Sequence, residues 1–251
     1  MDYGKKVFFL FPPSVVKEEL IFRLLEQEYE VYMLRDAAAA KRLLSIYPDS
    51  LLFANIDDGM SEPEWEIWIL GVLAEPATSE VGIGILTYNA SDDLRRKYLM
   101  DVGAKCGLIH MKLGIDESTH LLLATLNANE AKGRRRYVRA ECSGDQLSSI
   151  NLHHDGKKIS GQIKDISVVG FSCEFPSNPG LKKNTLISDI QLKLRGALLS
   201  ANAIVFGTRE QEGLFAYVFL FTPPLFGDSR TKIRKYVQTA LQAFIDAKAK
   251  G

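Results

Sequence analysis

Two short segments of the chain carry side chains suited to binding a nucleotide. The first is an arginine run that holds Arg134, Arg135 and, four residues after Arg135, Arg139. An arginine donates two parallel hydrogen bonds, which match either a phosphate or the O6 and N7 acceptors of guanine. Side chains four positions apart lie on one side of an extended segment as well as of a helix. Two such arginines could therefore clamp both ends of one ligand.

The second segment supplies complementary groups between Asp165 and Gly170. Asp165 is an acceptor for the N1 and N2 hydrogens of guanine, and the Ser167 hydroxyl can donate to a phosphate oxygen. Gly170 has no β-carbon, so it would permit a positive φ or a close approach of ligand to backbone. Each segment alone is weak evidence for a nucleotide site, because charged linkers and strand-end turns are common in unrelated proteins. Together, about one hairpin apart at the start of a β-rich region, they are much more specific.

The spacings Arg-x-x-x-Arg and Asp-x-Ser-x-x-Gly resemble the two motifs of the PilZ domain, whose family ligand is cyclic di-GMP. The resemblance covers Arg134 to about Phe221, and both motifs are intact. It implies a bacterial second-messenger receptor that binds cyclic di-GMP. The residues that would bind it are Arg134, Arg135, Arg139, Asp165, Ser167 and Gly170. In the family, the residue before the first motif arginine influences whether one or two stacked ligands are held; here Arg134 favours two, since a guanidinium can stack on guanine.

After Gly133 the chain consists of short apolar runs separated by turns, which predicts an antiparallel β-barrel. The clearest hairpin turn is Asp155-Gly156, because a type I′ turn needs positive φ and glycine tolerates it. The expected strands are Tyr137–Cys142, Leu147–His154, Lys157–Ile166, Gly170–Phe175, Ile187–Leu194, Leu199–Phe206 and Leu214–Phe221.

Helices are expected on both sides of the barrel in the sequence. Glu117–Lys132 has an amphipathic pattern, with Gly133 as its C-terminal stop, and would lead directly into the arginines. A terminal helix is expected over Asp228–Ala247. Its apolar face comprises Ile233, Val237, Leu241 and Phe244. That face could cover the barrel or pair with a partner.

The first half of the chain, from Lys5 to about Lys112, alternates short apolar runs with longer amphipathic stretches. This pattern predicts parallel strands joined by helices, an α/β domain. The expected strands are Val7–Phe11, Val31–Leu34, Leu51–Asn55, Val81–Thr87 and Gly107–His110, and the expected helices are Val15–Glu28, Ala37–Ile46 and Glu64–Leu73.

This order of elements, with Asp101–Lys105 and a lysine at position 112, resembles the receiver domain of response regulators. We therefore expect a degenerate receiver-like (flavodoxin-like) α/β domain over residues 1–132, followed by a PilZ β-barrel domain with its C-terminal helix over residues 133–251. The resemblance concerns fold more than chemistry. Receivers hold magnesium with an acidic pair after the first strand, where this chain has Leu10–Pro13. Metal binding is not expected there.

The phosphorylation site of receivers is also altered. The third strand ends at Asn55, and an amide cannot be the nucleophile that accepts phosphate. Thr87 and Lys112 match the switch hydroxyl and lysine of receivers, but without the carboxylates they lose their reaction. Asp57 and Asp58 lie just downstream as misaligned candidates for that aspartate. Ordinary loop aspartates are the preferred interpretation, because aspartate is common after strands.

Composition narrows the class of protein. The 251 residues are 46% hydrophobic and 25% charged, which is ordinary for a globular chain with two cores. The formal net charge is zero, so no global positive field favours nonspecific binding to nucleic acid or membrane. Three cysteines without Cys-x-x-Cys spacing argue against a disulfide framework or a zinc cluster. No secretion signal and no membrane span are expected, which indicates a cytoplasmic protein.

The sequence therefore predicts a non-enzymatic cyclic di-GMP receptor without catalytic residues, metal or cofactor. Ligand binding would order the arginine segment, change the arrangement of the two domains and signal to an unidentified protein partner. One alternative is a nucleic-acid-binding protein; the neutral total charge and the lack of an aromatic-rich basic strand face argue against it. A second alternative is an interaction adaptor in which the receiver-like domain recruits partners. Motility, adhesion and virulence are typical outputs of the family.

Overall fold

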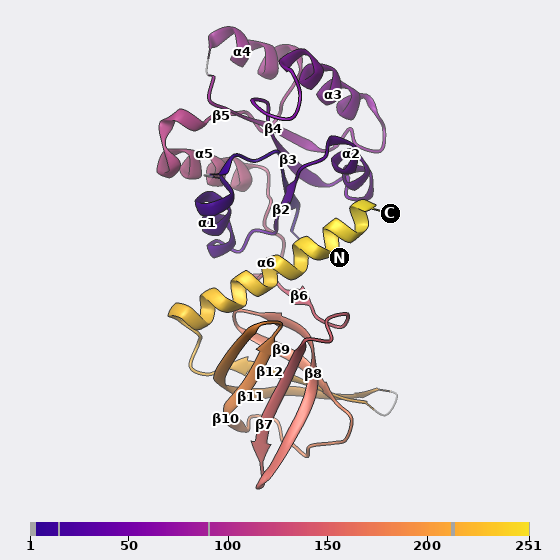
Figure 1. The fold of residues 1–251 in the computed structure, drawn as a ribbon, viewed down its shortest axis with the longest axis vertical. Helices are drawn as coiled ribbons and strands as arrows, with labels where there is room; N and C mark the ends of the chain where they lie inside the picture. Colours follow the sequence, from indigo (N-terminus) through magenta and orange to yellow (C-terminus); the bar gives the residue numbers. More distant parts are fainter. Residues whose placement is uncertain (1–3, 15, 90, 212–213, 251) are drawn as a thin grey trace. The chain divides into compact units, whose positions relative to one another are not determined.

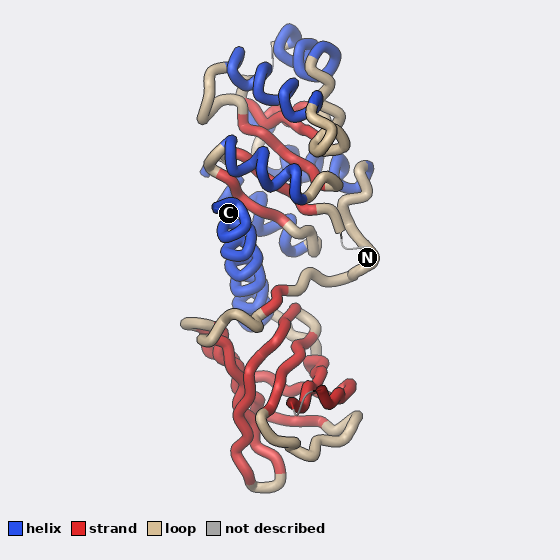
Figure 2. Tube along the Cα trace, turned by 90° about the vertical axis from the view of Figure 1, so that its right-hand side faces the viewer, coloured by secondary structure: helices blue, strands red, loops and turns tan. Residues whose placement is uncertain are grey.

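The computed structural model describes residues 4–14, 16–89, 91–211 and 214–250. The chain forms two compact units, Met1–Arg136 with Gln242–Gly251, and Tyr137–Leu241. The first unit mixes helices with strands, whereas the second consists mainly of strands (Figures 1 and 2).

The first unit contains a parallel sheet of five strands in the order β2-β1-β3-β4-β5. The strands are β1 (Lys6–Leu10), β2 (Val31–Leu34), β3 (Ser50–Asn55), β4 (Gly82–Thr87) and β5 (Leu108–His110). This is the flavodoxin-like order, and it confirms the predicted α/β fold. Every residue of β3 and β4 is buried, as expected for strands covered on both faces.

The helices of the first unit cover both faces of its sheet. They are the π-helix η1 (Val16–Leu20), α1 (Ile21–Glu26), α2 (Ala37–Ile46), α3 (Glu62–Ala74), α4 (Asp92–Arg96), the π-helix η2 (Lys97–Asp101), the 3-10 helix η3 (Met111–Leu113) and α5 (Ile115–Ala128). In Figure 1, α1 and α5 lie on one side of the sheet and α2 and α3 on the other. Apolar side chains of α1 and α5 share one core with β1 and β3. Trp65 and Ile69 of α3 are fully buried and belong to the core.

The predicted end of α5 is wrong. The helix stops at Ala128, well before Gly133. Glu130 adopts the left-handed conformation, with a φ of 52°. The N–H of Ala131 donates to the carbonyl of Leu126, and the N–H of Glu130 donates to that of Asn127. This is a Schellman ending formed without glycine, stabilised by burial of the Ala131 side chain.

Two further helical segments differ from the prediction. The expected helix Val15–Glu28 begins in the described residues as the π-helix η1 and ends as α1 at Glu26; residue 15 lies outside the described residues. The segment from Asp92 to Asp101 was not predicted as helical, although Ser91 caps it by accepting a hydrogen bond from the N–H of Leu94. Serine followed by two aspartates is a helix-start signal that could have revealed it.

The second unit is a closed antiparallel barrel. Six strands follow the order β8-β7-β10-β11-β12-β9, and β9 pairs with β8 to close the barrel, while β6 adds to β8. The strands are β6 (Ala140–Glu141), β7 (Ser148–His154), β8 (Lys157–Ser167), β9 (Gly170–Phe175), β10 (Leu186–Leu194), β11 (Ala197–Gln211) and β12 (Leu214–Phe221). The predicted barrel is thereby confirmed, and so is the Asp155-Gly156 turn, where φ is 49° and 72°.

The first barrel strand is much shorter than expected. Only Ala140 and Glu141 of the expected strand Tyr137–Cys142 pair with β8, opposite Ile166 and Asp165. Because β8 ends one residue after Ile166, the preceding residues 137–139 extend past the end of their neighbour. The expected strand Leu199–Phe206, in contrast, is longer than predicted as β11.

The terminal helix α6 (Gly227–Lys250) divides between the two units after Leu241. In the barrel unit, Ile233 and Val237 are buried in the core. In the first unit, the Gln242 side chain accepts from the N–H of Met33 and donates to its carbonyl oxygen, both at 2.9 Å, and so satisfies part of the β2 edge. Phe244 was predicted on the apolar face but is half exposed, and the neighbouring Ile245 is buried instead.

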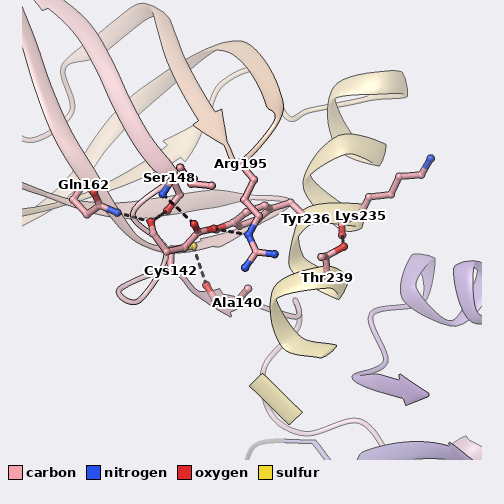
Figure 3. A network of polar contacts seen from close by, with 10 residues as sticks. Ala140, Cys142, Ser148, Gln162, Arg195, Lys235, Tyr236 and Thr239 are labelled. Atoms are coloured by element: carbon pink, nitrogen blue, oxygen red, sulfur yellow. Dashed lines mark hydrogen bonds and ion pairs between the residues drawn. The ribbon is translucent and has the colours of Figure 1, made fainter. Parts of the chain in front are cut away.

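A network of polar contacts connects α6 to the barrel within the second unit (Figure 3). The Asp145 carboxylate accepts from Nε of Arg195 and from the hydroxyl of Tyr236, each at 2.9 Å. Its carbonyl oxygen accepts from the side chains of Ser148 and Gln162 at 2.8 and 2.9 Å. One residue in the β6–β7 turn thus holds two strands, the β10–β11 turn and the helix.

Candidate functional site

The two motif segments meet on the outer face of the barrel. Arg139 directly precedes β6, and its Nη1 lies 2.9 Å from Oδ1 of Asp165 on β8. The other carboxylate oxygen of Asp165 accepts a hydrogen bond from the hydroxyl of Ser172 on β9. Register pairs Asp165 with both Ser172 and Glu141, which places these three side chains on one face. Both side chains of the ion pair are partly exposed, 44% for Arg139 and 26% for Asp165, whereas Oδ1 of Asp165 is itself buried.

A β-bulge lies next to this ion pair. The register of β8 against β9 shifts between Ile163 and Asp165, which leaves Lys164 as the extra residue. Bulges of this kind redirect side chains. Nζ of Lys164 lies 3.1 Å from Oε2 of Glu174, which forms a second ion pair beside the first. The face therefore presents both cations for phosphate oxygens and carboxylates for the N–H groups of a base.

Ser167 and Gly170 close the turn between β8 and β9. Ser167 is buried, and its hydroxyl donates to the carbonyl oxygen of Gly170 at 3.2 Å. Gly170 does not adopt a positive φ, so that expected reason for a glycine is wrong. A β-carbon at this position would lie 2.1 Å from the carbonyl oxygen of Phe219 on β12. The close approach that requires glycine is to a neighbouring strand of the barrel.

The remaining motif residues precede the barrel. Arg134 and Arg135 are exposed in the stretch between α5 and β6 and belong to the first compact unit, whereas Arg139, Asp165, Ser167 and Gly170 belong to the second. Within the barrel, the structure thus brings Arg139 to Asp165 and Ser167 to Gly170.

Sequence reasoning missed four neighbouring polar side chains: Glu141, Lys164, Ser172 and Glu174. Ser172 could have been found, because a two-residue turn between Ser167 and Gly170 places it opposite Asp165. The other contacts depend on the bulge and on the short β6 pairing, for which the sequence has no clear signal.

The ends of β3 and β4, where the resemblance to receivers predicts an altered phosphorylation site, are held by internal hydrogen bonds. Nδ2 of the buried Asn55 donates to the carbonyl oxygen of Phe11 at 2.9 Å. The Asp57 carboxylate accepts from the Thr87 hydroxyl at 2.7 Å and from the N–H of Tyr88 at 2.6 Å. Asp57 therefore ties the loop after β3 to the end of β4, while Asp58 is exposed. This arrangement fits the interpretation of both as loop aspartates.

Within the described ranges, no group of three or more His, Cys, Asp or Glu side chains could hold a metal ion. Among the helices of these same ranges, none combines the length and the apolar character needed to cross a membrane.

Comparison with known proteins identifies the second half of the chain. Residues 133–239 match the model of the PilZ domain family. Similar solved structures include the PilZ domain with c-di-GMP of YcgR from Escherichia coli, with 15% identity and a TM-score of 0.40 over 47% of this chain and 98% of that chain. No curated protein matches the chain.

Two further structures are similar at the same level. The K. pneumonia MrkH-c-di-GMP complex has 19% identity and a TM-score of 0.37 over 47% of this chain and 56% of that chain. The chemotaxis response regulator CheY4 of Vibrio cholerae has 18% identity and a TM-score of 0.40 over 50% of this chain and 98% of that chain. The similar region spans only about half of the longer relatives, 50% of the YcgR chain in its complex with c-di-GMP and 56% of MrkH.

Proposed function

Residues 133–239 are a PilZ domain, and from this premise we propose that the protein is a receptor for cyclic di-GMP. The observation that carries the proposal is the contact between the two motif segments, where Nη1 of Arg139 lies 2.9 Å from Oδ1 of Asp165. The pair lies on a partly exposed outer face that also carries Ser172 and the Lys164–Glu174 ion pair. A ligand with phosphates and guanine edges requires this mixture of donors and acceptors.

Each motif residue has a role in this proposal. Arg135 and Arg139 bind phosphate oxygens or the O6 and N7 edge of guanine, and Asp165 accepts from its N1 and N2 hydrogens. Without ligand, Arg139 is already paired with Asp165. Partly exposed ion pairs contribute about 1 kcal/mol or less, so exchanging this contact for a phosphate costs little. Ser167 and Gly170 act by holding the turn that presents Asp165.

The proposed output is a rearrangement of the chain rather than a reaction. Bound phosphates gather Arg134 and Arg135 with Arg139 against the barrel. The arginine run lies at the start of the proposed PilZ domain with its helix, residues 133–251, directly after the proposed receiver-like domain of residues 1–132. Its ordering would change their arrangement and signal to a protein partner. The described cysteines are free and buried, which is in keeping with the cytoplasmic location that we propose.

Calorimetric titration of cyclic di-GMP into the full chain tests the receptor function. We expect micromolar or tighter binding, weakened by about 100-fold or more in Arg135→Ala/Arg139→Ala, because each charged hydrogen-bonding side chain contributes about 1.5–3 kcal/mol. Arg95→Ala/Arg96→Ala removes two exposed arginines from α4 and serves as the charge-matched control. GMP and single-stranded DNA are the ligand controls.

The outcomes separate the candidate functions. If folded wild-type protein binds no cyclic di-GMP, the receptor function is refuted. If Arg135→Ala/Arg139→Ala binds as tightly as the wild type, the proposed role of these two arginines is refuted. Binding of single-stranded DNA that weakens steeply with salt would favour a nucleic-acid-binding protein instead.

The same titration reports the number of ligands. We expect two stacked molecules of cyclic di-GMP per wild-type chain and one in Arg134→Ala, because the guanidinium of Arg134 can stack on a guanine face and neutralise phosphate. Arg136→Ala, which removes the next arginine of the run, should keep two. A wild-type stoichiometry of one would remove this role of Arg134.

A further inference from the structure

The bulge in β8 places two charged neighbours on the same face of the barrel. In a regular strand, successive side chains point to opposite faces. Ile163 pairs with Cys173, and both are buried in the core. Asp165 pairs with Ser172 on the outer face, and Lys164 is the extra residue between the two pairs. The side chains of Lys164 and Asp165 are both partly exposed, so the bulge turns both of them outward.

Lys164 is held from two sides. Its carbonyl oxygen accepts from the N–H of Cys142 at 2.6 Å, which fixes its backbone beside the end of β6. Its Nζ lies 3.1 Å from Oε2 of Glu174 on β9. The register partners of Glu174 are Gln162 and Ala216, neither of which carries a charge. The carboxylate of Glu174 therefore has the Lys164 ammonium as its counter-ion.

The neighbouring carboxylate is engaged in a similar way. Oδ1 of Asp165 is buried and lies 2.9 Å from Nη1 of Arg139. Oδ2 of Asp165 accepts a hydrogen bond from the hydroxyl of Ser172. Arg139 and Lys164 are thus each held by a carboxylate of the same outer face. A ligand phosphate that binds either cation has to compete with that carboxylate.

The two carboxylates differ in what cyclic di-GMP can offer them, if the proposed receptor function holds. When Arg139 turns to a phosphate, the N1 and N2 hydrogens of guanine can replace it at Asp165. Glu174 belongs to neither motif segment and lies on the far side of Lys164 from this exchange. Its carboxylate competes with the ligand phosphates for the Lys164 ammonium, and it gains no donor in return.

We infer that Lys164 is a further phosphate-binding residue of the ligand site and that Glu174 lowers ligand affinity by holding it. The Cα atoms of Lys164 and Asp165 are about 3.8 Å apart, as in any trans peptide. The lysine has three donors on a flexible four-carbon stem, so its ammonium can move from Glu174 to a phosphate bound beside Asp165. The ion pair therefore acts as an internal competitor of the ligand.

Calorimetric titration of cyclic di-GMP into full-length variants tests this inference. Lys164→Met keeps the length of the stem and should weaken binding by about tenfold, because one charged donor to a phosphate is lost. Glu174→Gln should tighten binding by about threefold, because a partly exposed ion pair no longer competes. Both variants break the same ion pair, so a purely structural role would shift the affinity in the same direction in both. Thermal melting establishes that each variant is folded.

A matched control variant uses another part of the same strand. Lys158 is exposed on β8, six residues before Lys164 and so about 20 Å away along the strand. Lys158→Met should bind cyclic di-GMP with wild-type affinity. Equal weakening by Lys158→Met and Lys164→Met would mean that only the total charge of the barrel matters, and it would overturn the inference.

The double variant tests whether Glu174 acts through Lys164. Lys164→Met/Glu174→Gln should bind like Lys164→Met alone, because no ammonium is left for Glu174 to hold. An equal gain from Glu174→Gln in both backgrounds would overturn the inference, and so would wild-type affinity in Lys164→Met. These outcomes leave the receptor function intact as long as the wild type binds. If neither the wild type nor Glu174→Gln binds cyclic di-GMP, the receptor function is refuted and this inference with it.

Discussion

Gly170→Ala is expected to destabilise the barrel by about 3 kcal/mol or more, as for a severely overpacked core position. The added β-carbon would lie 2.1 Å from the carbonyl oxygen of Phe219. That atom belongs to the backbone of β12, which pairs with β9 along the whole length of β9, so it cannot move without disturbing the ladder. Denaturant unfolding followed by circular dichroism measures the loss.

Gly207→Ala is the matched control for this prediction. Gly207 also lies in a barrel strand, but no atom lies within 4 Å of the position of its added β-carbon. Its free energy of unfolding should stay within about 0.5 kcal/mol of the wild type. If Gly170→Ala were as stable as the wild type and lost only cyclic di-GMP binding, the glycine would serve ligand approach and the packing explanation would be wrong.

The sequence predicted best those elements whose ends are set by local chemistry. The helix α2 begins and ends where expected, because Asp36 caps it by accepting hydrogen bonds from the N–H groups of Ala38 and Ala39. The predicted bounds of β9 and β12 were also correct, since a turn precedes β9 and two prolines follow β12. Elements whose ends depend on a tertiary neighbour were not predicted correctly. β6 is short because β8 ends beside it.

In the candidate site, too, features set by local sequence were predictable and features that depend on tertiary pairing were not. Arg139 and Asp165 were recognisable from motif spacing, and the hairpin brings them together. Glu174 was not recognisable, because a regular ladder would not pair it with Gln162. The bulge at Lys164 shifts the register and produces this pairing. Gly170 was identified as special, but its packing against Phe219 depends on the β9–β12 pairing, which joins strands distant in sequence.

Asp145→Ala is expected to destabilise the second unit by about 2–4 kcal/mol. The substitution leaves Nε of Arg195 and the buried hydroxyl of Tyr236 without this acceptor. Because Tyr236 is on α6, the variant should also weaken the packing of the helix on the barrel. Hydrogen exchange of the amides between Ile233 and Leu241 would report this locally. Asp228→Ala, which removes a mostly exposed carboxylate from the same helix, should change stability by less than about 0.5 kcal/mol.

The contribution of the Asp145 charge should depend on pH in a defined direction. Burial raises the pKa of Asp145, but hydrogen bonds from Arg195, the N–H of Leu147 and Tyr236 outweigh burial and hold the pKa below its ordinary value. A carboxyl whose pKa is lower in the folded state stabilises that state above the unfolded pKa of about 3.9, and this stabilisation is lost as the pH falls through the folded pKa.

The comparison of wild type with Asp145→Asn isolates this effect, because other carboxylates titrate equally in both proteins. The difference in their free energies of unfolding should be constant from neutral pH down to about pH 5 and should narrow below about pH 4. In Asp228→Asn the difference should stay small at every pH, since that side chain is mostly exposed. A difference for Asp145→Asn that stays constant down to the acid transition would mean that the hydrogen bonds of this residue stabilise the barrel without depending on its charge.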